Sequence, residues 1–587
     1  MDAQQTPHNF QLPTHLIFMK TLDLKSLVKT LVPVSILNKL TGNVKIQRYI
    51  FSVEYNALLK KKLCRQLVSN AQINSSKNDA HSVRVLLPLI ETSHYQYYQL
   101  IALAKALELR GAQVKVLICG QSLDGCELKS VCNSNDDDPC WKCRFNEVNV
   151  VPLFGLETIK LTDVLSVEVI AKCGVDAKCL VVDEHKEIIR KGVNLSQSVD
   201  DSVVRFFYGA VPKDQDQVRK VREAHIKTAL MSIEAANYID DLWAPHVVLS
   251  NMPCYSAWEA YFRYFSINSS RFRQISMSAF EFKSVVFNGF ELFPANERFE
   301  KYLKTRKKPY LAQDELSKLY HFINKRHSGR ADIFSRDGYF SQDCRSEDIP
   351  EKLYLDKSKR NVFLFTNLYW DIGLSDRKGI FDGVLDWVIQ TIEILKSVPQ
   401  CHLYIKPHPA EVFGSAGSLK GVSDIIRDTY PNGLDNMTII EPNWKIITYD
   451  LFQYIDVGVI FTGTLGLEMM LSGIPVISTG STSHKGLGFA EEPDSIEAYR
   501  IMLLGENNSP KIDKDKLELF SYFYFIRTLI PWTLTKQAYA DSFDGFTFES
   551  LDDLKPGKDP YLDHLCNCIL DSDNTVPEDW PTATISN

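Results

Sequence analysis

The sequence lacks any long apolar run, because charged residues or proline interrupt every apolar segment before the roughly 20 residues that span a bilayer. Its first fifteen residues, MDAQQTPHNFQLPTH, lack the basic segment and apolar core of a signal peptide. An excess of basic residues is also missing, since 66 Lys and Arg stand against 73 Asp and Glu, a net charge of −7. These absences argue against a membrane span and against nucleic acid as a principal partner.

Cysteine is scarce as well, with 13 in 587 residues, so a reducing compartment is the default and we expect a cytoplasmic protein. Residues 19–40, MKTLDLKSLVKTLVPVSILNKL, mix Lys with apolar residues at helical spacing. A helix packed on the body of the protein is the simpler interpretation, and peripheral attachment to a membrane surface is the alternative.

What the sequence does contain is two series of alternating strands and helices, recognised by their apolar periodicity and turn residues. The first series predicts strands at 83–90, 112–120 and 245–251 and helices at 97–111, 218–243 and 257–265. The second predicts strands at 361–368, 402–407, 437–442 and 457–461 and helices at 380–397 and 464–473. The strand-helix-strand order implies parallel sheets with right-handed crossovers. We therefore predict an α/β protein with two Rossmann-like domains that face a central cleft.

The domain boundaries follow from polar tracts between these series. We expect a mostly helical N-terminal extension with a linker, a first Rossmann-like domain with a cysteine-bearing insertion, a second Rossmann-like domain, and a C-terminal helical region with a disordered tail. The corresponding ranges are 1–80, 81–345 with the insertion at 119–145, 346–505 and 506–587.

The stretch YIKPHPAEV (404–412) places three functional side chains directly after a predicted strand: Lys406, His408 and Glu411. Ligands of open α/β sheets bind beyond the carboxyl ends of strands. The prolines on either side of His408 restrict the backbone and would hold the imidazole in one place. A fixed imidazole beside a Lys suits a phosphate or a sugar-nucleotide hydroxyl, whereas a surface His after a capped strand is the alternative.

The stretch DVGVIFTGTLGLEMMLSGIPVIS (456–478) predicts a strand, a turn and a helix. Gly463 and Gly466 would let an anion approach the backbone, and Thr462 and Thr464 would add hydroxyl donors at the helix N-terminus. The stretch is no P-loop, because the terminal Gly-Lys-Ser/Thr is missing. A strand-turn-helix that Thr464 merely caps is the alternative.

Together these stretches resemble the C-terminal domain of GT-B glycosyltransferases, and more closely the capsule polysaccharide biosynthesis family, which includes the capsule Kdo transferases. The segments that carry the likeness are NLYWD (367–371), LDWVIQTIEIL (385–395), IKPHPAE (405–411), ITYDLFQYIDVGVIFTGTLGLEMMLSGIPVI (447–477), HKGLGF (484–489) and SVVRFFYG (202–209). The resemblance implies a GT-B fold and sugar transfer.

The resemblance also implies roles for individual residues. His408 and the Thr462–Glu468 segment would hold the nucleotide-sugar donor, with Glu468 bonding ribose hydroxyls or merely favouring the helix dipole. No metal or other cofactor would be required for catalysis, because the helix end and Lys406 would take the phosphate charge. Glu91 and His94 are the candidates for the base that deprotonates the acceptor hydroxyl. Asp371 is a third candidate, for donor-loop contact or for catalysis, with a cap or turn residue as the alternative.

A separate cluster contains Cys126, Cys132, Cys140 and Cys143, in the pattern C-x5-C-x7-C-x2-C. The surrounding segment is too polar to pack as core. The spacing allows a structural metal such as zinc, disulfides, or unpaired thiols, and these three interpretations stay open.

The resulting hypothesis is a glycosyltransferase that moves a sugar from a nucleotide sugar to a surface polysaccharide or glycolipid, in bacterial capsule or lipopolysaccharide synthesis. The expected partners are the nucleotide sugar, the glycan or glycolipid acceptor, and a polysaccharide synthesis complex at the inner membrane, with no nucleic acid. Three alternatives remain: a sugar-nucleotide epimerase, a CDP-polyol phosphotransferase of similar architecture, and a non-catalytic nucleotide-sugar-binding assembly factor.

Overall fold

The computed structural model describes most of the chain beyond residue 81. The described ranges are 82–91, 96–131, 138–183, 186–252, 254–267, 271–277, 283–288, 296–328, 348–371, 379–412, 417–444, 446–506, 512–536 and 545–571. The expected N-terminal extension, its amphipathic stretch at 19–40 and the tail after residue 571 lie outside these ranges. No helix within the described ranges is long and apolar enough to cross a membrane.

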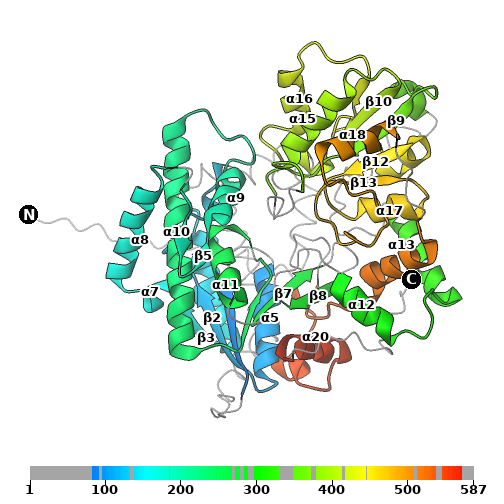
Figure 1. Cartoon of the computed structure of the whole chain (residues 1–587). Helices are drawn as coiled ribbons and strands as arrows, with labels where there is room; N and C mark the ends of the chain where they lie inside the picture. Colours follow the sequence, from blue (N-terminus) through cyan, green and yellow to red (C-terminus); the bar gives the residue numbers. More distant parts are fainter. Residues whose placement is uncertain are drawn as a thin grey trace, which may run out of the picture. The chain divides into compact units, whose positions relative to one another are not determined.

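The first sheet has seven strands in the order β14-β8-β7-β6-β1-β2-β3, of which β2, β3, β7 and β8 are labelled in Figure 1. Five neighbouring strands are parallel, and β8 and β14 continue the sheet in antiparallel pairings. The strands are β1 (Arg84–Leu89), β2 (Gln113–Ile118), β3 (Glu157–Lys160), β6 (Val247–Ser250), β7 (Phe272–Met277), β8 (Lys283–Asn288) and β14 (Ile530–Pro531). The parallel part has the Rossmann order 3-2-1-4-5.

The second sheet repeats that order with five parallel strands, β11-β10-β9-β12-β13. They are β9 (Arg360–Phe365), β10 (Cys401–Lys406), β11 (Met437–Ile439), β12 (Val457–Ile460) and β13 (Val476–Ser478). Both Rossmann-like sheets predicted from the sequence are thus confirmed. In each, the chain switches sides beside its first strand, between β1 and β6 and between β9 and β12, which is where ligands bind in such sheets.

Each of the five helices predicted from the sequence is present, with ends that differ from the predicted ones by up to four residues, and the structure adds helices for which no range was predicted. Those of the first half include α5 (Gln96–Glu108), α6 (Trp141–Asn149), α8 (Val167–Leu180), α9 (Ser196–Phe206), α10 (Gln215–Trp243) and α11 (Tyr255–Ile267). Those that follow include α12 (Asn296–Thr305), α13 (Gln313–His327), α15 (Val384–Leu395), α16 (Val422–Thr429), α17 (Leu465–Leu471), α18 (Ile496–Leu504), α19 (Lys514–Tyr522) and α20 (Pro560–Leu570).

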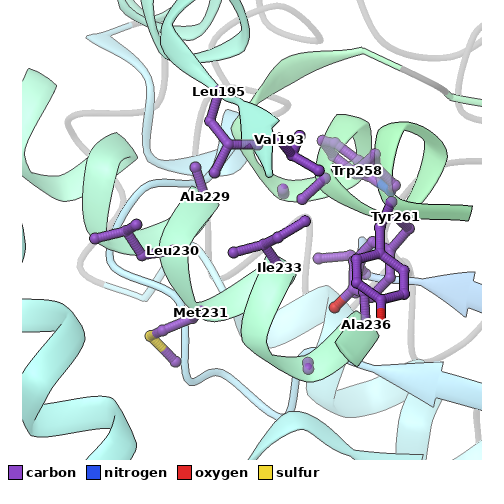
Figure 2. Packing of buried hydrophobic residues seen from close by; sticks show 14 of the residues in the cluster. Val193, Leu195, Ala229, Leu230, Met231, Ile233, Ala236, Trp258 and Tyr261 are labelled. Carbon is purple, nitrogen blue, oxygen red and sulfur yellow. The ribbon is translucent and has the colours of Figure 1, made fainter. Parts of the chain in front are cut away.

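Each sheet is anchored by buried apolar side chains. In the first, residues of α9, α10 and α11 pack with the two-stranded hairpin β4 (Ile189–Arg190) and β5 (Val193–Asn194), as Figure 2 shows for Val193, Ile233 and Trp258. In the second, β9 buries Val362 and Leu364 against α15, α16 and α18, while alternate residues pack against α13, α17 and α19. Burial on both faces explains why these strands are continuous apolar runs.

Candidate functional site

Lys406 is the last residue of β10, and its position follows from the run of six buried residues that forms this strand. The side chain is 3 % exposed, and within the described residues no ion pair or hydrogen bond reaches its ammonium group. Burial lowers the pKa of Lys406 to about 8, so the group is mainly charged at neutral pH. A buried cation without an anionic partner is costly, and a bound anion would offset that cost.

His408 follows Lys406 at the same edge of the sheet and begins a 3₁₀ turn, Pro409–Glu411. Its Nδ1 accepts a hydrogen bond from the Ala410 N–H at 3.1 Å. Burial lowers the pKa of His408 to about 4; the charge of Lys406 also lowers it, and that of Asp371 raises it. The neutral imidazole therefore carries its proton on Nε2 and presents a hydrogen-bond donor.

Glu411 has a local role in this structure. Its carboxylate is buried and accepts hydrogen bonds from the Val422 N–H at 3.0 and 3.3 Å, which caps the start of α16. Burial raises the pKa of Glu411 to about 7. The side chain therefore holds the strand-to-helix connection in place, rather than facing the ligand directly as the sequence suggested.

The turn after β12 lies beside β9, because these two strands pair directly. Gly463 has a φ of +111°, and nothing lies within 4 Å of where a Cβ would be, so the backbone there is open. Both threonine hydroxyls bond within the protein: Thr462 donates to the Ser481 carbonyl at 2.7 Å, and Thr464 donates to Glu468 at 3.3 Å. What the turn offers a ligand is therefore its open backbone.

Glu468 is fully buried and forms a two-pronged ion pair with Arg326 of α13, at 2.9 and 3.2 Å. Both carboxylate oxygens are thus engaged, one of them also by Thr464. Neither points to solvent, so this structure gives Glu468 a structural role in place of the expected ribose contact.

The same edge of the sheet gathers buried polar atoms that have no hydrogen-bond partner within the described residues. They are Oγ1 of Thr366, Oδ1 of Asn367, Oγ1 of Thr482 and both ring nitrogens of His484. His484 lies next to the first turn of α17, since a Cβ on Gly466 would be 3.5 Å from its Cε1. Burial lowers the pKa of His484 to about 4, so the ring is neutral. Such groups are rare in folded proteins and mark places where water or a ligand is bound.

Two of the three predicted catalytic candidates belong to a second group of charges. Asp371 follows β9 and lies 3.7 Å from Arg205, which is also 3.5 Å from Glu127. Glu91 follows β1 and is close enough to raise the pKa of Glu127. The third candidate, His94, lies outside the described residues. Arg205 falls in the SVVRFFYG segment, but its role depends on contacts that sequence spacing does not reveal.

The cysteine cluster is only partly described, because Cys132 lies outside the described ranges. No disulfide joins Cys126, Cys140 and Cys143 to one another. Across the described ranges, no three or more His, Cys, Asp or Glu side chains are grouped so that they could hold a metal. The structural zinc therefore stays a prediction.

No protein-family model and no curated protein matches this chain. Among solved structures, two KpsC β-Kdo transferases of Thermosulfurimonas dismutans, acting as 2,4 and 2,7 transferases, are 14% and 12% identical. They cover 53% and 52% of this chain and 88% and 84% of their own, with TM-scores of 0.34 and 0.32. A UDP-GlcNAc 2-epimerase from Neisseria meningitidis is 9% identical, covers 72% of this chain and 89% of its own, and has a TM-score of 0.22.

Proposed function

We propose that the protein is a GT-B glycosyltransferase that transfers a sugar from a nucleotide-sugar donor to a glycan or glycolipid. The observation that carries this proposal is the buried ammonium of Lys406 at the carboxyl end of β10. It is a fixed positive charge without a protein counter-ion in the described residues, at the edge where α/β sheets bind ligands. The phosphate of a nucleotide sugar is the anion that fits a Rossmann-like sheet.

Three further features support a nucleotide sugar over a simple anion. His408 presents an Nε2–H donor next to Lys406. The open backbone at Gly463 allows close approach of a phosphate oxygen. The unpartnered atoms of Asn367, Thr482 and His484 can bond hydroxyl groups, which a sugar or ribose supplies. We also propose that the two Rossmann-like domains face a central cleft and that catalysis needs no metal. The proposed setting is capsule or lipopolysaccharide synthesis.

A thermal-shift screen with CMP, UDP, GDP and CDP tests donor binding, because a ligand of the folded state raises the melting temperature by mass action. We expect one nucleotide to stabilise the protein and Lys406→Met to remove that shift in melting temperature.

We also expect Lys406→Met without ligand to melt at a higher temperature than the wild type without ligand. The pKa of Lys406 is lowered to about 8, so below that pH its buried charge costs about 2–4 kcal/mol.

Lys396→Met is the matched control, because Lys396 is an exposed lysine paired with Glu393. It should leave the nucleotide shift unchanged. An unchanged shift in Lys406→Met would contradict the proposed donor site.

Incubation of nucleotide sugars without an acceptor separates the alternatives, since formation of an epimer would contradict the transferase. His408→Ala should abolish transfer, and full polymer synthesis by that variant would favour an assembly role.

A further inference from the structure

The loops at the carboxyl edge of the first sheet bring together acidic groups and one arginine. Glu127 lies in a 3₁₀ turn, Glu127–Lys129, on the chain segment after β2, and Glu91 directly follows β1. Arg205 is near the end of α9. Tyr255 opens α11, five residues after β6. The strands β1 and β6 are the pair between which this sheet switches sides, so the cluster lies where such sheets bind their ligands.

Glu127 is held in place by its neighbours. A Cβ on Gly125 would lie 2.8 Å from the backbone of His225 in α10, so the segment is pressed directly against that helix. The Gly125 N–H also donates to Oγ1 of Thr228 at 3.0 Å. The Glu127 side chain is 17% exposed; its Oε2 lies 3.5 Å from Arg205, and Oε1 has no partner among the described residues.

Arg205 is equally constrained. Its guanidinium lies 4.7 Å from the ring centre of Trp370 and 5.2 Å from that of Tyr208. Tyr208 has a φ of +47°, an unusual conformation for a bulky residue. Cation–π contacts of this kind and the ion pair with Asp371 fix the charge beside Glu127.

Tyr255 is a second bulky residue of this cluster that has an unfavourable backbone conformation. Its φ is +67°, its side chain is buried, and its hydroxyl has no hydrogen-bond partner in the described residues. The next residue, Ser256, donates its N–H to Oγ of Ser202 at 2.9 Å, which ties α11 to α9. Non-glycine residues held at positive φ cluster at functional sites, where the surrounding structure maintains them.

We propose that Glu127 is the base that accepts the proton of the acceptor hydroxyl, and that Arg205 is a positioning residue that stabilises the ionised carboxylate of Glu127. This inference rests on the proposed glycosyl transfer. In the step, the acceptor O–H bond breaks and its proton passes to Oε1 of Glu127. The freed electron pair forms the bond to the anomeric carbon. The bond from that carbon to the phosphate oxygen breaks, and its electron pair leaves with the nucleotide.

The electrostatics of the cluster agree with this role. Burial raises the pKa of Glu127 to about 8; Arg205 lowers it and Glu91 raises it. Tyr255 and Asp371 face the same guanidinium. A base with a pKa near the working pH is effective, because it combines a usable ionised fraction with a strong affinity for the proton. Asp371 is a weaker candidate, because its side chain is 44% exposed and paired with Arg205.

The test uses the full-length protein, a panel of CMP-, UDP-, GDP- and CDP-linked sugars, and lipid-tagged monosaccharides as acceptors. Glu127→Gln should reduce transfer by about 10²–10⁴-fold while the nucleotide thermal shift stays as in the wild type. Added formate should partly restore transfer in Glu127→Ala, because a small carboxylate can occupy the space. Glu168→Gln, at an exposed position in α8, is the control. Transfer by Glu127→Gln within tenfold of the wild type would overturn the inference.

The pH profile of kcat at saturating donor gives a readout that a merely structural role would not move, because the bound phosphate keeps Lys406 charged. Activity should rise with pH and reach half its maximum near pH 8, where Glu127 ionises. Arg205→Gln removes the charge that lowers this pKa, so the midpoint should move to higher pH. Glu91→Gln removes the charge that raises it, so the midpoint should move to lower pH. Unmoved midpoints in both variants would overturn the role of the cluster.

Infrared titration of the carboxyl band works without any substrate. Two protonated carboxyl signals should disappear as the pH rises in the wild type, one near pH 7 from Glu411 and one near pH 8 from Glu127, and Glu127→Gln should lack only the second. A midpoint near the ordinary value for glutamate would overturn the inference even if transfer occurs. Absence of nucleotide binding in the wild type would instead contradict the proposed function.

Discussion

At the scale of single residues, the candidate donor site depends on side chains whose pKa values differ from their ordinary values in water. Lys406 is buried and has a lowered pKa, and His408 and His484 are neutral for the same reason. One charge and two neutral imidazoles suit a ligand with one anionic group and several hydroxyls. The sequence indicated Lys406 and His408 as site residues, whereas His484 was noted only as the start of the HKGLGF segment, because no local pattern places its ring beside the turn after β12.

The charge of Lys406 predicts how nucleotide binding depends on pH. Binding of the phosphate needs the protonated amine, and the pKa of that amine is lowered to about 8. The dissociation constant of the nucleotide should therefore be flat below pH 8 and rise about tenfold per pH unit above it, which calorimetry between pH 6 and about 10 can measure. Lys406→Met should bind weakly at every pH. A wild-type affinity that is constant through this range would contradict the assignment of Lys406.

At the scale of secondary-structure elements, α17 is connected to α13 by the Glu468–Arg326 pair. The pair joins residues 142 positions apart in the chain, and both side chains are buried. The helix itself is short, so its dipole adds little to the site, and its placement depends on this pair and on the close contact of Gly466 with Ile460. A Cβ on that glycine would lie 2.5 Å from the terminal Cδ1 of Ile460, so a larger residue there would force the isoleucine side chain to move.

Breaking the pair should therefore cost stability rather than specific ligand contacts. We expect Glu468→Gln to lower the free energy of unfolding by about 3–5 kcal/mol, because it breaks a buried ion pair by removing the carboxylate charge that faces Arg326. Denaturant unfolding with and without the nucleotide measures both quantities. The control Glu497→Gln breaks an exposed pair with Arg500 and should change nothing measurable. If Glu468→Gln instead lost nucleotide affinity at unchanged stability, the result would support the ribose contact that the sequence suggested for Glu468.

At the scale of the whole molecule, the C-terminal region contributes to both sheets. The strand β14 pairs with β8 at the edge of the first sheet, and α20 contacts α5, β6 and β8. Residues of α19 belong to the core of the second sheet. The sequence predicted this region as a separate helical segment, because neither a two-residue strand nor its distant partner leaves a periodic pattern.

Removing this region should prevent stable folding. A chain that ends at Glu506 lacks β14, α19 and α20, and α20 alone buries Leu562, Leu565 and Ile569. Each such side chain contributes about 1.5–3 kcal/mol, which together approach the whole stability of an ordinary domain. A chain that ends at Asp571 keeps these elements and is the control. Cooperative thermal unfolding should be retained only in the longer chain, and its retention in both would contradict the prediction.

The sequence by itself determined the two Rossmann-like sheets and the stretches that end at Lys406 and Gly463. Apolar periodicity, turn residues and the order of strands are local or nearly local signals. Only the tertiary structure decided that Glu411 and Glu468 are engaged inside the protein and that Glu127, Arg205 and Asp371 meet. Partners far apart in sequence determine burial and charge pairing. The same carboxylate can therefore be a helix cap, an ion-pair partner or a base, depending on what folding places beside it.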